Sequence, residues 1–306
     1  MIVVNTVLGQ IPAQQLGITL SHEHLFTNPG HPELYQDSVL TNMHKIIQEA
    51  ALFRAAGGET IVEMTPLNFG RNVTAYREIS RATGIQVICA TGFHKEEFIP
   101  AWFQTKSNRE IIDLLMAEIN RGVANTGIRP GVIKIGTSYK TISSTERRAI
   151  EIAAFVQKET SLPISSHCDQ GTMAIDQADL FVRLGVQPEK VVLGHVDIPN
   201  DAEYLKKICS LGFNVGIDHI GRDMTLKDIV KIGLIKDVIA SGFIDHIMLS
   251  GDMGKKSYLK SFGGKPGLGY VLREFKNNML QNGVKEQEFQ HILVDNPRRV
   301  FGLALS

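Results

Sequence analysis

Two histidines separated by one residue lie in an apolar segment near the start of the chain. The segment reads GITLSHEHLF and contains His22 and His24. In an extended strand, side chains two residues apart point to the same side, so both imidazoles face one point while Glu23 points away. Paired histidines on one strand also occur in hydrogen-bonded cores, so this segment alone leaves metal binding and packing open.

Ionisable residues also end three other apolar segments. His167 lies near the end of LPISSHCD, His195 near the end of KVVLGHVD, and Asp252 ends DHIMLSGD. Imidazole and carboxylate groups are ligands that suit zinc and its first-row neighbours. If these strand ends meet at one place, four histidines and one carboxylate favour a metal centre over a core hydrogen-bond network.

Eight short apolar segments would position these residues, and nearly every one has a polar or ionisable residue near its end. They are rich in Ile and Val, and several are almost continuously apolar, as expected of parallel strands buried on both faces. They recur about every 33 residues, which is the size of a βα unit. The segments are residues 17–26, 59–66, 85–93, 131–138, 162–169, 190–197, 213–220 and 245–252.

Helical patterns separate the predicted strands. In residues 41–56 and 144–159, apolar residues recur three and four positions apart, which is typical of amphipathic helices. Ser144 or Thr145 is expected to cap the second helix, and Gly57 to end the first in a left-handed conformation.

This alternation predicts the α/β class and a (β/α)8 TIM barrel. No linker-like stretch interrupts residues 1–306, so we expect a single domain. A doubly wound open sheet is the alternative, but only a closed barrel brings eight strand ends around one centre. The predicted metal site therefore lies at the mouth formed by the carboxyl ends of the strands.

Composition and charge exclude several classes of protein. Of 306 residues, 43% are hydrophobic and 21% are charged, and 32 Lys and Arg balance 32 Asp and Glu. This balance creates no long-range field for nucleic acid or an anionic membrane. Three cysteines without a C-x-x-C pair disfavour a disulfide framework, and no apolar run suits a signal core or a membrane span. We expect a cytoplasmic protein whose partner is a small-molecule, anionic substrate.

Lys134 is an unusual residue for a buried strand. It lies between isoleucines in GVIKIGTS, where a protonated amine is costly to bury without a partner. From the residues alone, the simpler interpretation is an ion pair with a nearby carboxylate such as Glu63.

Six segments together resemble the phosphotriesterase-type members of the amidohydrolase superfamily, in the family order and spacing over essentially the whole chain. They are SHEHLF, VIKIGTS, SSHCD, LGHVD, GIDHI and LSGDM. The resemblance implies a barrel hydrolase, commonly a homodimer, with two divalent ions that are zinc or alternatively manganese or cobalt. The ligands it implies are His22, His24 and Asp252 for one ion, His167 and His195 for the other, and Lys134, carboxylated by carbon dioxide, between them.

Such a site carries out hydrolysis, because two ions that share a water lower its pKa and polarise the bond to be broken. Asp252 is placed to take the proton of the attacking water. His219 in GIDHI resembles the family histidine that receives this proton next, and Asp218 beside it is expected on the opposite face of the strand. Asp197 either orients a metal ligand or caps the following turn.

A local group of lysines points to the substrate. GDMGKKSYLKSFGGKPG follows the eighth predicted strand and contains four lysines, and Arg222 follows the seventh. Loops at these positions of a barrel often bind phosphate, although a solvated loop has the same composition. The residues expected to hold a substrate phosphate are Lys255, Lys256, Tyr258 and Arg222.

Three functions remain open at this point. The family that the chain resembles includes phosphotriesterases, acyl-homoserine lactonases and sugar lactonases. All of these reactions pass through oxyanionic states that the same metal pair can stabilise, so the metal ligands do not distinguish between the substrates. The lysines favour a lactonase that opens sugar 1,4-lactones carrying a 5-phosphate. A metal-binding protein without catalysis is disfavoured, because structural zinc sites usually have four protein ligands and no open position.

Overall fold

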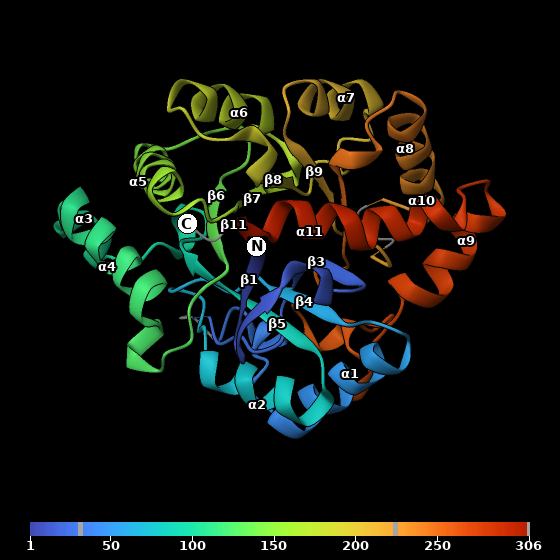
Figure 1. Ribbon diagram of the computed structural model, residues 1–306, viewed down its shortest axis with the longest axis horizontal. Coiled ribbons are helices and arrows are strands. Elements are labelled where there is room, and N and C mark those ends of the chain that lie inside the picture. The colour runs from blue at the N-terminus through green and yellow to red at the C-terminus, as the bar shows by residue number, and fades with distance from the viewer. Residues whose placement is uncertain (30–32, 223–225, 305–306) are drawn as a thin grey trace.

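The computed structural model describes residues 1–29, 33–222 and 226–304. Eight parallel strands stand inside a ring of helices (Figure 1). All eight predicted strand segments are confirmed, and neighbours in the sequence are neighbours in the sheet. The strands are β3 (Thr19–Glu23), β4 (Thr60–Glu63), β5 (Gln86–Gly92), β6 (Val132–Thr137), β7 (Ile164–Cys168), β8 (Val191–Gly194), β9 (Asn214–Ile217) and β10 (Ile247–Leu249).

At least one helix follows each barrel strand and covers its outer side (Figure 1). Both helices predicted from the sequence are present, but Ser143 caps α5, one residue before the expected cap. Its hydroxyl accepts from the backbone N–H of Glu146 at 3.2 Å, and Glu146 accepts in return from the backbone of Ser143 at 2.9 Å. The helices are α1 (Met43–Ala55), α2 (Val73–Thr83), α3 (Trp102–Thr105), α4 (Asn108–Arg121), α5 (Ser144–Thr160), α6 (Ala174–Arg183), α7 (Ala202–Ser210), α8 (Asp228–Ala240), α9 (Lys276–Gln281), α10 (Glu286–Gln290) and α11 (Asn296–Phe301).

Side chains close the barrel between its first and last strands. The hydroxyl of Ser21 on β3 donates to the carbonyl of Leu249 on β10 at 3.2 Å. The backbone N–H of His22 donates to the hydroxyl of Ser250 at 3.1 Å. The register of β3 against β4 also shifts between Leu20 and Glu23, an irregularity of the kind that re-aims side chains beside active sites.

Two hydrophobic clusters form the core, one between strands and helices and one inside the barrel. Lys134 lies two residues after Val132 on β6, so both side chains point to the interior. The inner cluster fills the barrel below Lys134 and leaves the mouth to polar residues. Its members include Val62, Ile88, Val132, Val192 and Met248 from the strands, and Leu16 and Phe301 from outside them.

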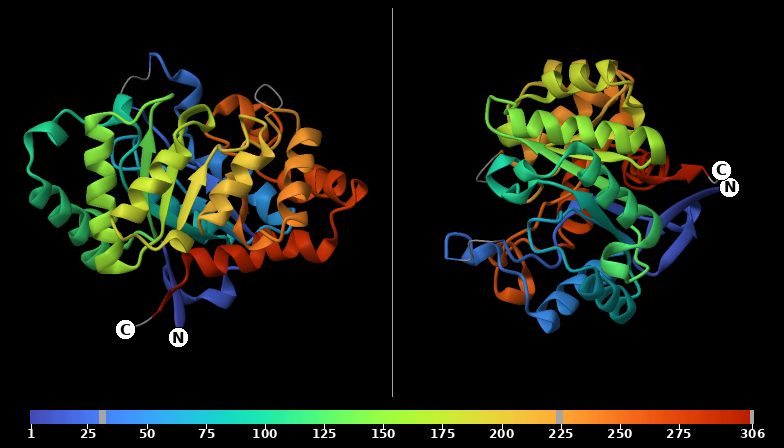
Figure 2. Two further views of the ribbon diagram at one scale, coloured as in Figure 1. Left: turned by 90° about the horizontal axis from the view of Figure 1, so that it is seen from above. Right: turned by 90° about the vertical axis from the view of Figure 1, so that its left-hand side faces the viewer.

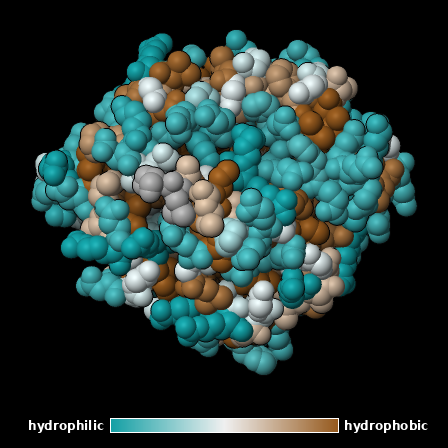
Figure 3. Space-filling model, in the orientation of Figure 1, coloured by the Kyte–Doolittle hydropathy of each residue, from teal (hydrophilic) through white to brown (hydrophobic). Residues whose placement is uncertain are grey.

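A small antiparallel sheet that the sequence analysis did not predict joins the two ends of the chain. Its strand order is β11 (Leu303–Ala304), β1 (Ile2–Thr6) and β2 (Gly9–Pro12). Both termini lie at one end of the barrel, and the strand arrows point toward the other end (Figure 2, left). The face with the termini is mostly hydrophilic, with scattered hydrophobic residues (Figure 3). In the described part of the chain, no helix combines the length and apolar character needed to cross a bilayer.

Candidate metal centre

His22 on β3 and His24, which directly follows that strand, meet the aspartate that follows β10. His24 Nε2 lies 3.3 Å from Asp252 Oδ1, and His22 Nε2 lies 3.8 Å from the same oxygen. These three residues form a group whose potential ligand atoms all lie within 4.8 Å of one another. Residues that are 228 to 230 positions apart are therefore brought together across the closure of the barrel, as the sequence analysis predicted.

Three further imidazoles continue this group around the mouth. The ring of His195 lies 4.5 Å from that of His167, 4.6 Å from that of His219 and 5.1 Å from that of His22, measured between centroids. His195 Nε2 is 2.8 Å from His167 Nδ1. His219 Nε2 lies 3.3 Å from Asp252 Oδ2. The candidate ligands of β3 and β7 and of the segments after β3, β8 and β10 thus converge at one end of the barrel, together with His219 after β9.

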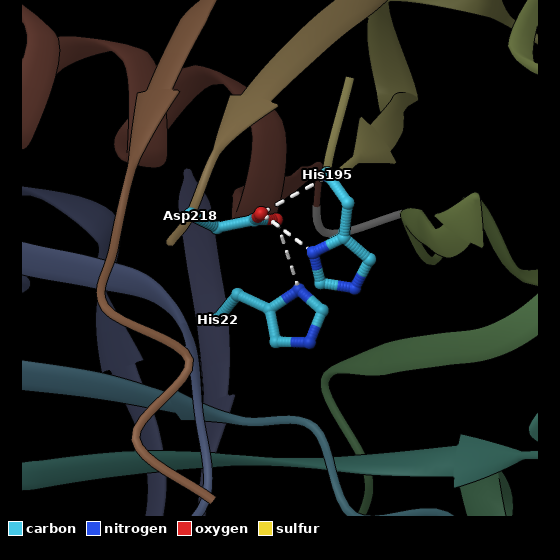
Figure 4. A group of neighbouring side chains, drawn as sticks. All are labelled: His22, His195 and Asp218. Carbon is cyan, nitrogen blue, oxygen red and sulfur yellow. Dashed lines mark hydrogen bonds and ion pairs between the residues drawn. The ribbon is translucent and has the colours of Figure 1, made fainter. Parts of the chain in front are cut away.

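Asp218 connects two of these rings, contrary to expectation (Figure 4). Its Oδ1 lies 2.7 Å from Nδ1 of His195 and its Oδ2 lies 3.3 Å from Nδ1 of His22. The prediction that Asp218 points to the opposite face is wrong, because β9 ends at Ile217 and strand alternation does not extend beyond that residue. Because Asp218 contacts Nδ1 of both imidazoles, their Nε2 atoms remain available to bind a metal ion.

Asp197 does not orient a ligand histidine through a direct contact. Both of its carboxylate oxygens are buried and have no hydrogen-bond partner. Burial, together with the nearby charge of Asp218, raises the pKa of Asp197 to about 7. Asp218, and not Asp197, makes the direct contacts with these histidines.

Two residues of the centre have left-handed backbone conformations. The φ angle is +65° at His195 and +49° at Asp252. Such angles cost of order 1–3 kcal/mol at non-glycine residues and cluster at functional sites. Hydrogen bonds hold both: His195 N–H donates to Asp218 Oδ1 at 3.0 Å, and Asp252 N–H donates to the carbonyl of His22 at 3.2 Å.

Lys134 is buried among these residues, with 1% of its surface exposed. Its Nζ lies 3.3 Å from Nε2 of His22. Glu63 instead accepts hydrogen bonds from the backbone N–H of Leu25 and from Thr65, and within the described residues Lys134 forms no ion pair with it. Burial lowers the pKa of Lys134 to about 8, so a neutral amine is accessible near physiological pH.

The chemistry of the donor atoms fits a divalent metal. Burial lowers the pKa of His22 to about 3 and that of His219 to about 4, and it lowers the pKa of His167 well below the usual range. These imidazoles are therefore neutral, which is the form that binds a metal. Nε2 of His167 is buried without a hydrogen-bond partner. Neutral imidazoles, a carboxylate and an unpartnered ring nitrogen are a donor set for zinc and its neighbours.

The cavity at the mouth also contains part of the predicted phosphate group. The cavity is open to solvent and has a volume of about 490 Å³. Arg222, Lys255 and Tyr258 line it beside the histidines. The ring of Tyr258 lies 4.8 Å from the guanidinium of Arg222 and 5.6 Å from the Lys255 amine. Lys256 does not line this cavity, and its amine points to the loop after β3 and donates to the carbonyl of Gln36 at 2.8 Å.

Four lining residues were not among the predicted site residues. Ser38, Phe69, His94 and Gly254 border the same cavity, and the ring of His94 lies 4.7 Å from that of His167. The only sequence signal for His94 was its position directly after β5. Ser38 and Phe69 lie in loops, where no periodic pattern indicates which way a side chain points.

Comparisons with known proteins give matches over nearly the whole chain. The sequence matches the phosphotriesterase family over residues 2–301. A phospho-furanose lactonase from Mycoplasmopsis synoviae is 35% identical over 319 residues, which cover 96% of this chain and 90% of that protein. A lactonase from Listeria monocytogenes superposes with a TM-score of 0.93 at 29% identity, covering 98% of both chains. The phosphotriesterase homology protein of Escherichia coli, solved with phosphate in its active site, has a TM-score of 0.90 at 31% identity and covers 94% of this chain and 99% of that one.

Proposed function

Because the chain belongs to the phosphotriesterase family, we propose that this hydrolase is a metal-dependent lactonase whose substrates are furanose 1,4-lactones carrying a 5-phosphate. One observation carries the proposal: Arg222, Lys255 and Tyr258 line the same cavity as His22 and His24. A cationic group in the same cavity as the histidines suits a substrate that has an anionic group and, apart from it, a carbonyl that reacts.

We propose a pair of ions in this cavity. When bound, the ions lower the pKa of a water molecule and polarise the lactone carbonyl. Zinc suits the imidazole and carboxylate donors, with manganese or cobalt as alternatives. The ligands we assign are His22, His24 and Asp252 for one ion, His167 and His195 for the other, and carboxylated Lys134 for both.

The environment of Lys134 supports its carboxylation. The neutral amine adds to carbon dioxide, which forms an N–C bond and releases one proton, and the product is an anionic carbamate with two oxygen donors. Burial lowers the pKa of this amine to about 8 and so increases the fraction of the neutral form needed for that step. A carbamate also replaces a buried positive charge with an anion, which suits the neighbourhood of two cations.

The residues around the reacting carbonyl have separate tasks. Asp252 accepts a proton from the attacking water as oxygen adds to the lactone carbonyl carbon. The ring C–O bond then breaks, and the sugar oxygen that leaves takes up this proton. His219 Nε2, 3.3 Å from Asp252 Oδ2, provides a second acceptor for the proton. Asp218 keeps Nε2 of His22 and His195 directed at the ions.

A phosphotriesterase or an acyl-homoserine lactone hydrolase would use the same metal ligands. The lining of the cavity favours the phosphorylated lactone over both, because the amine of Lys255 is cationic and neither a neutral triester nor an acyl chain compensates that charge. The guanidinium of Arg222 also lines the cavity and pairs with Asp252 Oδ2 at 2.6 Å. The homodimer implied by the family resemblance is part of this proposal and is checked by size-exclusion chromatography with light scattering.

The test is a substrate comparison. The purified protein is loaded with zinc or manganese in the presence of bicarbonate, and acid release is measured for sugar 1,4-lactones with and without a 5-phosphate. An aryl phosphotriester is measured in parallel. We expect the highest kcat/KM for a phosphorylated lactone. A higher value for the plain lactone or the triester would reject the phosphate assignment and retain the metal-dependent hydrolase.

A further inference from the structure

Glu23 lies between two of the assigned metal ligands and is fully buried. It points away from the cavity, as the strand alternation predicted, and its carboxylate reaches the segment after β10. Oε1 accepts from the backbone N–H of Gly251 at 2.7 Å and from the hydroxyl of Ser250 at 2.8 Å. Oε2 accepts from the backbone N–H of Met253 at 2.8 Å.

These bonds bracket Asp252. The backbone N–H groups immediately before and after Asp252 both donate to the carboxylate of Glu23, and the N–H of Asp252 itself donates to the carbonyl of His22. All three successive N–H groups are thereby bound to two adjacent residues of β3. Asp252 has a φ angle of +49°, a conformation that persists only where the surroundings hold it.

Glu23 also acts where the barrel has its weakest backbone pairing. Among the described strands, β3 and β10 are the ends of the ladder order, and the contacts between them include the side chains of Ser21 and Ser250. No backbone ladder joins the two described strands at this point, so the position of Asp252 relative to His22 and His24 depends on the single backbone bond from Asp252 N–H to the His22 carbonyl and on side-chain hydrogen bonds.

We propose that Glu23 is a positioning residue that fixes the backbone of Asp252 and thereby the separation of its carboxylate from His24. This inference rests on the proposed function, in which Asp252 both holds an ion and accepts the proton. The residue between His22 and His24 thus connects them to the carboxylate with which they share an ion. Glu23 itself touches neither substrate nor metal in this assignment.

A purely structural role in closing the barrel is the competing explanation, and Glu49 provides a matched control. Glu49 on α1 is also buried, with 1% exposed. It accepts from the backbone N–H groups of Ser261 at 2.7 Å and Leu268 at 3.0 Å. Both carboxylates therefore bind backbone N–H groups of the segment after β10, but only that of Glu23 binds next to Asp252.

The experiment compares E23Q with E49Q. Glutamine has the shape of glutamate but presents one oxygen and an NH2 group, so E23Q places a donor against one of the three donors. We expect E23Q to lower kcat and the affinity for the bound metal by about 10- to 100-fold, with KM changed by less than about threefold. E49Q is expected to lower the melting temperature and to keep kcat and metal content close to wild type.

Crystal structures of both variants give a readout that requires neither activity nor metal. In E23Q we expect Asp252 to leave the left-handed region, or its carboxylate to move away from His24, while E49Q retains the wild-type conformation. If E23Q does not fold, S250A replaces it, because that change removes one donor to Glu23 and the acceptor of the His22 N–H, and the same shifts are expected at smaller size.

Two results are kept apart by this design. An unchanged Asp252 backbone together with a kcat and metal content equal to those of E49Q would overturn the role of Glu23. A wild-type protein that binds no metal and opens no lactone would instead reject the proposed function, and the Asp252 conformation in E23Q would still be measurable.

Discussion

Asp218 and His195 are joined by two hydrogen bonds through a single carboxylate oxygen. Asp218 Oδ1 accepts from the backbone N–H of His195 at 3.0 Å and lies 2.7 Å from its Nδ1. The other oxygen lies 3.3 Å from Nδ1 of His22. Since these histidines are assigned to different ions, one carboxylate orients a ligand of each.

We predict that D218N weakens both halves of the centre. An asparagine side chain offers one acceptor oxygen, so one of the two Nδ1–H groups loses its partner and the ring is free to turn. Metal affinity and kcat/KM are each expected to fall by about 10- to 100-fold. The measurements are metal content after dialysis against a weak chelator and initial rates of lactone hydrolysis.

The control for this change is D197N. Asp197 is equally buried and close in sequence to His195, but its oxygens have no hydrogen-bond partner. Burial raises its pKa to about 7, so a neutral amide at this position is expected to keep kcat/KM near the wild-type value. Equal losses in D197N and D218N would show that any buried carboxylate in this region serves as well as Asp218.

D252N is expected to separate catalysis from folding. Asparagine tolerates the left-handed φ of +49° found at Asp252, so the backbone is retained while the charge and the proton acceptor are lost. We expect kcat to fall by about 10²- to 10⁴-fold, with an unchanged circular dichroism spectrum. A variant that kept more than a tenth of the wild-type rate would remove Asp252 from the mechanism.

Lys255 and Lys256 are neighbours with different surroundings, which makes them a matched pair. Lys255 lines the cavity, whereas Lys256 donates to the carbonyl of Gln36. K255A is expected to reduce the preference for phosphorylated over plain lactone by about tenfold, as expected when a charge-assisted contact is lost. K256A should leave that ratio unchanged. A fall of the same size in both variants would indicate a general effect of loop charge.

Removal of metal tests the assignment of Lys134. Chelation should abolish lactone hydrolysis, and recovery on addition of zinc should be faster with bicarbonate than without it. K134M removes a buried amine and keeps an apolar chain of similar length, so the barrel is expected to fold. We expect this variant to lose the bridging ligand of the metal pair, and elemental analysis measures the loss. Wild-type metal content in K134M would exclude a carboxylated lysine.

The three cysteines are expected to be unreactive in the folded protein. Cys89, Cys168 and Cys209 are free and buried. Burial raises the pKa of Cys89 and of Cys209 to about 12 and raises that of Cys168 further. A raised pKa reduces the thiolate fraction at pH 8, so reaction with a thiol reagent should be slow in the native state and complete after unfolding. Rapid labelling of the native protein would contradict this burial.

Much of the fold was predictable because buried parallel strands have a clear pattern. Runs such as those in β8 and β10 are apolar on both faces, and the eight runs recur at the spacing of a βα unit, so the number and order of the barrel strands followed from the sequence. The small sheet of β1, β2 and β11 was not predicted, since its pairing of Val3 with Leu303 joins residues 300 positions apart. No local pattern indicates such a contact.

Within the candidate site, too, some features followed from the sequence and others did not. The pattern of one strand determines that His22 and His24 share a side and that Glu23 faces away from them. Strand ends determined that His167, His195 and Asp252 are candidates, and the family resemblance supplied the grouping of ligands around two ions.

Only the tertiary structure decided which residues support those candidates. It assigned Asp218 rather than Asp197 to the histidines, directed Lys256 away from the cavity, and joined Glu23 to the backbone on both sides of Asp252. The alternation of side chains along a strand specifies the side to which each residue points. This alternation stops where the strand ends. The partner that a residue meets there comes from another strand or loop, and that partner is set by the closure of the barrel.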